Sequence, residues 1–415
     1  MAWKIPLLTT ALLLALAPSA HALPEISARA AIVIDGVTGQ VLWGRNIHQR
    51  LPQASTTKMM TGIVALERGN LSDTVVVSKR SSDITGSSIY LEPGERLTFE
   101  QLLYGVMLNS GNDASNAVAE YVGGSTDRFV ALMNDKAKEL GLKNTQYSNP
   151  HGLPADDHYS SVYDMAMIAR YALANPEFAK IATTKAIEVP GNGRIERRVL
   201  VNHNKLLRYF PGAFGGKTGY TSVAGRCFVG SAKRDGRYVI EAVLDAPKMW
   251  EDSEALLNYG LDKFKSESVA KAGTAIGKVD VIGGRNAQVA AILPQDVSVT
   301  VGPGFQGAIT TSHEIFPDVQ APVAAGQTVG TFHVKQGDKL VASFPLTAAS
   351  AVTAAPPLTT ELTPVLGWFL KGGAFSALVF GFVRWRGHRR RLRKLRRRKN
   401  QSALLGYSNA IHLNR

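Results

Sequence analysis

The sequence predicts an α+β domain, an all-β domain after it and an apolar helix near the C-terminus. Residues 23–268 combine segments of helical periodicity with alternating β-branched segments, whereas residues 269–350 contain short strand-like runs separated by turns. Residues 364–383 are mostly apolar and have about the length that a bilayer-spanning helix needs. A chain of 415 residues is long enough for two domains that each bury a core.

The N-terminus has the composition of a secretory signal. Lys4 precedes the apolar stretch 7–17, and Ala-His-Ala at positions 20–22 supplies the small residues of a cleavage site. We therefore expect residues 1–22 to be a signal peptide and the protein to be exported. The single cysteine, Cys227, excludes an internal disulfide, so the exported fold depends on its core alone.

The α+β domain is expected to contain one antiparallel sheet packed with helices. Two strands, residues 31–34 and 41–45, flank an Asp-Gly-Val-Thr-Gly turn and pair with a hairpin over residues 224–244. Thr98 begins a capping box at the start of the second helix. The helices bury apolar faces against the sheet and supply the core. They are predicted over residues 55–68, 99–108, 113–122, 126–140 and 163–174.

The first candidate site motif is Ser-x-x-Lys, with Ser55 at a helix start and Lys58 one turn further along. This spacing places both side chains on one helix face. A serine hydroxyl needs a base to accept its proton, and a lysine desolvated beside other cations is neutral enough to be that base. We therefore expect Ser55 to be a nucleophile and Lys58 its base, although the string alone also fits an ordinary helix start.

The second motif is Ser-Gly-Asn at positions 110–112, in the turn between two predicted helices. A hydroxyl and an amide on such a turn can relay a proton to a leaving amine and hold a substrate amide. Ser110 is therefore the candidate catalytic relay, and Asn112 is a candidate substrate-binding residue. By itself, this string also fits ordinary turn chemistry.

The third motif, Lys217-Thr218-Gly219, lies on a predicted strand just before the hairpin. A cation and a hydroxyl on an edge strand can bind a terminal carboxylate, and a glycine lets a substrate backbone come close. Lys217, Thr218 and Gly219 are therefore candidate substrate-binding residues. The backbone amides of Ser55 and Tyr220 are expected to form the oxyanion hole.

Taken together, in this order and at these separations, the three motifs resemble those of penicillin-binding proteins and class A β-lactamases. Residues from about 25 to 355 resemble a low-molecular-mass penicillin-binding protein of the D-alanyl-D-alanine carboxypeptidase type, peptidase family S11. The resemblance implies a β-lactamase/transpeptidase-like catalytic domain over residues 23–268 and a small β-sandwich after it. Connecting segments that also resemble the family are residues 87–94, 141–145 and 149–154.

The resemblance also implies an activity. The terminal D-Ala of peptidoglycan stem peptides is expected to be hydrolysed through a seryl enzyme at Ser55, with β-lactams acylating the same serine. Alternatives on this scaffold are a DD-endopeptidase, a β-lactamase and a non-catalytic β-lactam sensor. A β-lactamase needs a carboxylate that activates water, and residues 149–157 lack a Glu-x-x-x-Asn element. A sensor is expected to carry a cytosolic signalling domain, and only sixteen residues follow Lys399.

No cofactor or metal ion is expected. A zinc carboxypeptidase needs clustered His and acidic ligands, and the nine histidines are scattered without a His-Glu-x-x-His element. The all-β domain likewise contains no paired acids or metal-ligand cluster, so it is interpreted as a spacer that holds the active site away from a membrane. Residues 351–363, rich in Ala, Thr and Pro, are expected to be a linker.

The net charge of +14 is concentrated at the C-terminus, and the rest of the chain is nearly neutral. Residues 384–399 contain eleven Lys or Arg and no acid, directly after the apolar run 364–383. This order predicts a transmembrane helix with a basic cytosolic tail, residues 384–415, that contacts anionic lipids. The enzyme then lies on the extracytoplasmic face of the cell membrane. A surface-lying amphipathic helix is the alternative, and nucleic-acid binding is not expected.

Overall fold

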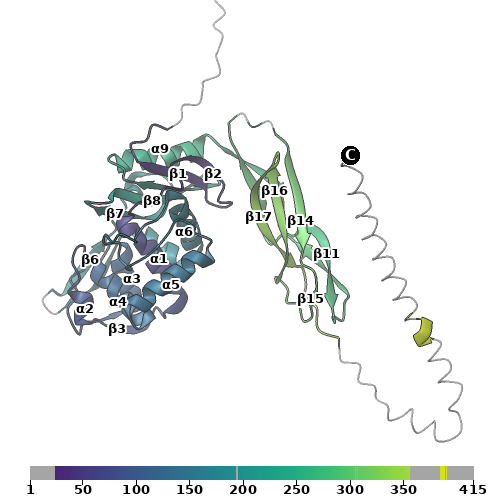
Figure 1. Ribbon diagram of the computed structural model, residues 1–415, viewed down its shortest axis with the longest axis horizontal. Helices are drawn as coiled ribbons and strands as arrows, with labels where there is room; N and C mark the ends of the chain where they lie inside the picture. Colours follow the sequence, from purple (N-terminus) through teal and green to yellow (C-terminus); the bar gives the residue numbers. More distant parts are fainter. Residues whose placement is uncertain are drawn as a thin grey trace, which may run out of the picture.

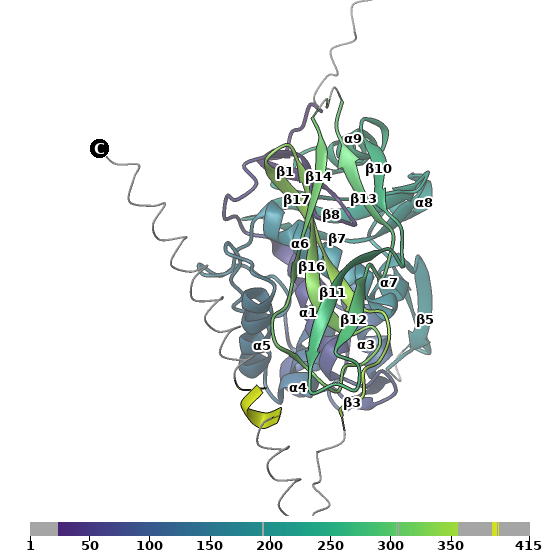
Figure 2. The same ribbon diagram turned by 90° about the vertical axis from the view of Figure 1, so that its right-hand side faces the viewer.

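The computed structural model describes residues 24–192, 195–303, 305, 307–355, 384–387 and 389. A sheet-and-helix domain is followed by an elongated all-β domain that lies beside it (Figure 1). The perpendicular view in Figure 2 places the all-β domain across one side of the first. The predicted order, an α+β domain followed by an all-β domain, is confirmed.

Five antiparallel strands form the sheet of the first domain, in the order β2-β1-β9-β8-β7. The two predicted N-terminal strands pair with each other, and the first of them pairs with the predicted hairpin. All six residues of β1 are buried, because helices cover both faces of the sheet. The strands are β1 (Ala30–Asp35), β2 (Val41–Arg45), β7 (Ala213–Thr221), β8 (Gly225–Arg234) and β9 (Arg237–Leu244).

Helices pack on the two faces in unequal numbers. On one face, α9 (Met249–Asp262) packs against β1, β8 and β9. On the other face, α6 (Val162–Ala174) contacts β1 and β9, and the remaining helices build the larger core beneath it. The predicted helices occur as α1 (Lys58–Arg68), α3 (Phe99–Met107), α4 (Asn112–Gly123), α5 (Thr126–Glu139) and α6.

The structure confirms one of two helix starts predicted from the sequence, at Thr98, and shifts the other, at Ser55. The capping box at Thr98 is confirmed, since its side chain accepts from Gln101 N–H while the Gln101 side chain accepts from Thr98 N–H. Ser55, in contrast, lies in a 3₁₀ turn, η1 (Ala54–Thr57), and α1 begins only at Lys58. The chain enters this turn through Ala54, whose φ of 48° is left-handed.

Several elements lie outside those that the sequence predicted. Most are too short to show a period, and a four-residue helix or a three-residue strand is fixed by its neighbours. They are β3 (Thr74–Val76), α2 (Lys79–Ser82), β4 (Arg96–Thr98), α7 (Pro176–Thr183), β5 (Ala186–Pro190), β6 (Arg197–Val201), α8 (Leu206–Tyr209) and α9.

The all-β domain contains a six-stranded sheet, ordered β14-β16-β17-β12-β11-β15, and the β10-β13 pair. Apolar side chains from both sheets share one core. The strands are β10 (Lys265–Ala270), β11 (Ala275–Ile282), β12 (Gln288–Ile292), β13 (Val297–Val301), β14 (Ile309–Ile315), β15 (Val319–Gln320), β16 (Thr328–Gln336) and β17 (Lys339–Ala348). Val352 and Ala354 still form β-bridges to this domain, inside the segment expected to be a linker.

The two domains contact each other at the end of β1. The Thr300 hydroxyl on β13 donates to Asp35 Oδ2 over 2.6 Å. Within the all-β domain, Gln336 Nε2 donates to Thr300 O over 2.7 Å. The other Asp35 oxygen accepts from the N–H groups of Val37 and Thr38 in the β1–β2 turn. One buried carboxylate therefore orders a turn of the first domain and binds the second domain.

Within the described part of the chain, no helix is long and apolar enough to cross a membrane. The predicted signal peptide (1–22) and transmembrane helix (364–383) lie outside the described residues, as does most of the basic tail (384–415).

Glu241 is an unusual residue in the centre of the sheet. It lies on β9, it is fully buried, and neither carboxyl oxygen has a hydrogen-bond partner of good geometry among the described residues. Burial raises the pKa of this carboxyl well above its ordinary value, and the nearby Ser253 hydroxyl offsets the rise only in part. Folding therefore favours the protonated form of this carboxyl, whereas the unfolded chain ionises it at its ordinary pKa.

We expect Glu241→Gln to stabilise the protein at pH 8. For a carboxyl whose folded pKa is raised, stability is greatest below the ordinary pKa of 4.5 and is lost as the pH rises toward the folded value. Glutamine cannot ionise, so the variant should be more stable than the wild type at alkaline pH and should differ little from it at pH 4.5. Urea unfolding across this pH range measures the difference. The exposed Glu267→Gln is the control, and equal pH slopes for wild type and Glu241→Gln contradict the prediction.

Candidate active site

Lys58 is the centre of the candidate site and is fully buried at the start of α1. Its Nζ atom lies 3.1 Å from Ser55 Oγ, 2.8 Å from Asn112 Oδ1 and 2.6 Å from the carbonyl oxygen of His151. The contact with Ser55 follows from the one-turn spacing of Ser-x-x-Lys. The other two partners come from segments distant in sequence, so only the fold brings them here.

Electrostatics favour a neutral amine at Lys58. Burial lowers the pKa of Lys58 well below its ordinary value, the positive charge of Lys217 lowers it further, and Asp113 opposes the shift. A neutral amine has two hydrogens and one lone pair. Asn112 Oδ1 and the His151 carbonyl accept the two hydrogens, so the lone pair remains for the Ser55 hydroxyl. The geometry thus provides a base for the candidate nucleophile.

Ser110 lies in the short connection between α3 and α4. It has a left-handed φ of 60°, which is uncommon outside glycine, and its residue is only 4% exposed. Its Oγ atom has no hydrogen-bond partner among the described residues. A buried hydroxyl without a partner is costly in a folded protein, and such groups occur at functional sites.

Asn112 is held by a loop that precedes it by some twenty-five residues. Its side-chain Nδ2 donates to Thr85 O over 2.7 Å, and its backbone N–H donates to Ser87 O over 2.7 Å. These bonds orient the amide so that Oδ1 faces Lys58. The neighbouring Asp113 accepts from Ser88 Oγ and from Leu91 N–H, which attaches the same loop to the start of α4.

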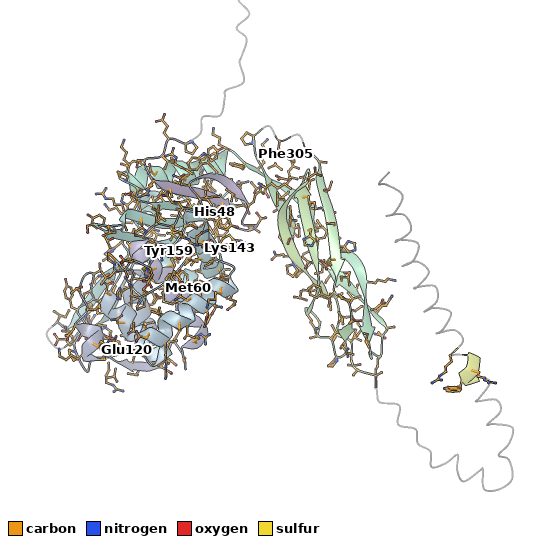
Figure 3. All side chains as sticks on the ribbon, viewed as in Figure 1. His48, Met60, Glu120, Lys143, Tyr159 and Phe305 are labelled. Atoms are coloured by element: carbon orange, nitrogen blue, oxygen red, sulfur yellow. The ribbon has the colours of Figure 1, made fainter. Side chains whose placement is uncertain are left out.

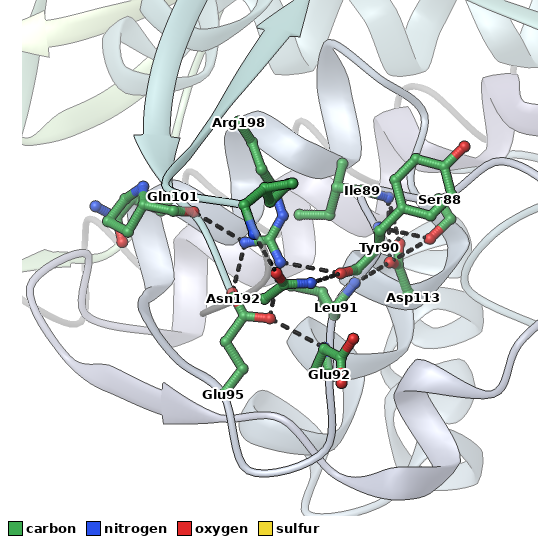
Figure 4. A network of polar contacts seen from close by, with 12 residues as sticks. Ser88, Ile89, Tyr90, Leu91, Glu92, Glu95, Gln101, Asp113, Asn192 and Arg198 are labelled. Atoms are coloured by element: carbon green, nitrogen blue, oxygen red, sulfur yellow. Dashed lines mark hydrogen bonds and ion pairs between the residues drawn. The ribbon is translucent and has the colours of Figure 1, made fainter.

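A buried ion pair braces this loop from the other side (Figure 4). Arg198 on β6 contacts Glu95, with Nη2 and Oε2 2.9 Å apart, and both side chains are less than a tenth exposed. The same nitrogen donates to the carbonyl of Tyr90, which has a φ of 60°. Sequence reasoning missed this pair, because the partners are 103 residues apart and neither belongs to a motif.

The third motif lies on β7, the edge strand of the sheet, as predicted for Lys217 and Thr218. Lys217 is 1% exposed, its Nζ donates to Thr218 O over 3.0 Å, and burial lowers its pKa to about 7. A Cβ atom on Gly219 would lie only 2.9 Å from the backbone nitrogen of Ser55. The absence of a side chain at Gly219 therefore lets β7 approach the candidate nucleophile, and Tyr220 is the next residue on this strand.

A loop after α5 completes the site and was not assigned a role from the sequence. Gly152 has a φ of 89°, and a Cβ atom there would lie 1.9 Å from Ala54 O and 3.0 Å from Ser55 N. This close packing places the His151 carbonyl against Lys58. The segment Asn-Pro-His-Gly-Leu was noted only as a family resemblance, and a backbone acceptor has no residue-type signature.

Two histidines of this region are neutral. Burial is the main cause that lowers the pKa of His151 to about 3, and its Nδ1 accepts from Leu153 N–H. Burial lowers the pKa of His158 to about 4, while its Nδ1 accepts from Ser148 N–H and its Nε2 contacts Thr57 Oγ1 over 2.7 Å. In each neutral ring Nδ1 accepts a backbone N–H, so the ring proton is on Nε2, and in His158 this proton is donated to Thr57 Oγ1. Among the described residues no group of His, Cys, Asp and Glu could hold a metal ion.

Comparisons with known proteins agree with this arrangement. Residues 17–248 match the family described as D-alanyl-D-alanine carboxypeptidase, and residues 264–354 match the penicillin-binding protein 5 C-terminal domain. The D-alanyl-D-alanine carboxypeptidase DacF of Bacillus subtilis (strain 168) is 35% identical over 359 residues, 82% of this chain and 92% of that protein. The Escherichia coli (strain K12) DacA is 32% identical over 366 residues, 82% of this chain and 90% of that protein.

A solved structure extends the likeness to both domains. Penicillin-binding protein 5 from Haemophilus influenzae superposes with a TM-score of 0.63 at 31% sequence identity, covering 80% of this chain and 99% of that one. The first family match includes the segments that carry Ser55, Lys58 and Lys217. The chain therefore belongs to the D-alanyl-D-alanine carboxypeptidase family of penicillin-binding proteins.

Proposed function

We propose that this protein is a serine-type D-Ala-D-Ala carboxypeptidase that removes the terminal D-Ala from peptidoglycan stem peptides, and that penicillin acylates the same serine. The observation that carries the proposal is the buried Lys58 amine, 3.1 Å from Ser55 Oγ, with two other acceptors for its hydrogens. A serine acyl-enzyme is also the general mechanism of the family.

In the acylation step, Ser55 Oγ attacks the carbonyl carbon of the D-Ala-D-Ala bond and its proton passes to Lys58 Nζ. The resulting oxyanion accepts hydrogen bonds from the N–H groups of Ser55 and Tyr220. The carbon–nitrogen bond then breaks as Ser110 donates its proton to the leaving amine and regains one from Lys58. The unpaired, buried Ser110 hydroxyl supports this relay.

In the second step, water attacks the ester carbonyl and gives a proton to Lys58, which returns it to Ser55 Oγ as the ester bond breaks. The product is the shortened peptide with a new carboxylate. In a β-lactam, attack opens the four-membered ring, and the leaving nitrogen stays attached to the acyl group. The same serine is therefore acylated without loss of a fragment.

Substrate binding is assigned to β7 and the start of α4. Lys217 and Thr218 bind the terminal carboxylate, Gly219 lets the peptide backbone approach, and Asn112 holds the substrate amide. The pKa of Lys217 is lowered to about 7 by burial alone, so a bound carboxylate favours its charged form. Since β7 pairs with β8 on one side only, its other edge is available to an extended peptide.

We also propose an extracytoplasmic location, with the chain attached to the cell membrane through residues 364–383 and the basic tail at anionic lipids. The support is compositional: a signal-like segment over residues 1–22, an apolar run of bilayer length, and the Lys/Arg cluster at 384–399. The all-β domain then separates the active site from the bilayer.

Replacing the nucleophile tests the function directly. Ser55→Ala removes the attacking oxygen, so we expect neither release of D-Ala from a synthetic stem pentapeptide nor covalent labelling by a fluorescent penicillin. Product analysis of the wild type separates the alternatives, since an endopeptidase cleaves a cross-link, a β-lactamase turns over penicillin and a sensor releases nothing. Covalent labelling of the alanine variant would show that the nucleophile is elsewhere.

Substitutions of the two buried lysines are expected to have different effects on activity. Lys58→Ala should block acylation by every ligand, whereas Lys217→Ala should raise KM for peptide about ten- to hundredfold, the effect of losing a charge-assisted contact. Lys217 loses its charge above about pH 7, so kcat/KM should fall on the alkaline side. Lys217→Arg should move that limb to higher pH, because arginine stays charged. The assignment of different roles to the two lysines is contradicted if the alkaline limb of kcat/KM is unchanged in Lys217→Arg. It is also contradicted if both alanine variants fold but lose all activity.

The proposed membrane attachment makes two predictions. Truncation after Ala355 should give a secreted enzyme that retains its activity on small peptides, because every assigned residue lies at or before Tyr220. In intact spheroplasts, the 384–399 cluster of the full chain should resist added protease and become cleavable on lysis. Cleavage from outside, or extraction of full-length protein by alkaline carbonate, would favour a surface-lying helix.

A further inference from the structure

The proposed function fixes the direction of a bound substrate, and the inference below rests on it. The carboxylate of the last residue lies at Lys217 and Thr218, and the scissile carbonyl faces the N–H of Tyr220. An extended peptide added to β7 therefore runs toward Thr221 as it goes back toward its N-terminus. With a rise of about 3.3 Å per residue, the residue before D-Ala-D-Ala reaches the end of β7.

A cavity lies at that end of the strand. It has a volume of about 430 Å³, and Val223, just after β7, contributes to its wall. Pro52 lines it three residues before Ser55, and Pro154 lines it from the loop whose Gly152 packs against Ala54. The cavity therefore continues the candidate active site in the upstream direction of the substrate. Its lining includes Arg50, Pro52, Pro154, Asp156, Tyr159 and Val223.

Two opposite charges are set in a mostly apolar lining. Arg50 and Asp156 are its basic and acidic residues, and the imidazole of His158 is neutral because burial lowers its pKa to about 4. Prolines, Val223 and the ring of Tyr159 supply the apolar surface. Such a lining suits a long side chain with an aliphatic stem and a charged end.

Arg50 is exposed, and contacts with neighbouring residues orient its side chain. Its Nη2 donates to Lys143 O over 3.2 Å, its Nε donates to Asn144 Oδ1 over 3.3 Å, and its guanidinium carbon lies 5.0 Å from the centre of the Tyr159 ring. Lys143 and Tyr159 are labelled close together in Figure 3. A guanidinium has five N–H donors, so these bonds leave donors for a ligand carboxylate.

We propose that this cavity binds the side chain of the third stem-peptide residue and is matched to a diamino dicarboxylic acid. The end of such a side chain bears an ammonium and a carboxylate, which pair with Asp156 and Arg50 respectively. A lysine side chain pairs with Asp156 but brings its charge near the Arg50 guanidinium. An uncharged aliphatic side chain leaves both charges without a partner. The chain thus selects its substrate by the charge pattern of one residue.

Binding measurements with uncleaved peptides test the preference. Three stem pentapeptides that differ only at the third residue, a diamino dicarboxylic acid, lysine or norleucine, are titrated calorimetrically into Ser55→Ala. We expect the diamino dicarboxylic peptide to bind about fivefold or more tightly than the lysine peptide, and norleucine most weakly. Equal dissociation constants for the three peptides overturn the proposal.

Charge-neutralising variants then locate the preference. In the wild-type background, Arg50→Gln should lower kcat/KM for the diamino dicarboxylic peptide until it equals that for the lysine peptide. Asp156→Asn should lower kcat/KM for both of these peptides relative to the norleucine peptide. The matched controls are Arg68→Gln at the end of α1 and Asp127→Asn in α5, which should leave all ratios unchanged. If Arg50→Gln lowers all three peptides equally, Arg50 is structural and the proposal fails.

The outcomes separate this proposal from the proposed function. N-acetyl-D-Ala-D-Ala and fluorescent penicillin lack the third residue, so their turnover and labelling report only on Ser55 chemistry. If neither reacts with the wild type, the proposed function fails, whereas the calorimetric order of the three peptides still decides the cavity. If both react but the peptides are bound and cleaved equally, only the cavity assignment fails.

Discussion

Burial of the Lys58 amine is the constraint on which the active site depends. A buried amine needs acceptors for its hydrogens, because an unsatisfied polar group inside a protein is costly. Asn112 Oδ1 and the His151 carbonyl meet that need, and they bring the start of α4 and the loop after α5 against the helix that bears Ser55. The same contacts that stabilise the fold leave the lone pair of Lys58 facing the serine hydroxyl.

The two buried lysines have different surroundings, and this difference accounts for their different roles in catalysis and in binding. Lys58 has three oxygen neighbours within hydrogen-bond distance, whereas Lys217 Nζ donates to the carbonyl of the adjacent Thr218. Burial lowers the pKa of Lys58, a charged Lys217 lowers it further, and a carboxylate beside Lys217 favours the charge on Lys217. The charge of Lys217, which is assigned to substrate binding, therefore helps to keep Lys58 neutral enough to act as a base.

The sheet separates the active site from the second domain. β7 is an edge strand, so one side of its backbone is available to a peptide, and Gly219 brings that strand against Ser55. The all-β domain contacts Asp35 on β1, and β8 and β9 lie between β1 and β7. Attachment at the far strand leaves the β7 edge uncovered, and the Arg50 and Asp156 cavity extends from the end of that edge.

The sequence by itself determined the features that depend on neighbours along the chain. The one-turn spacing of Ser55 and Lys58, the capping box at Thr98 and the antiparallel hairpin all follow from local geometry, and the structure contains them. Tertiary structure alone decided the His151 carbonyl contact, the Arg198–Glu95 brace and the cavity at Arg50. The first two contacts join segments 93 and 103 residues apart, and the cavity brings Arg50 together with Val223. One partner is a backbone carbonyl, which every residue type carries alike. A sequence pattern cannot specify such a partner until the chain has folded.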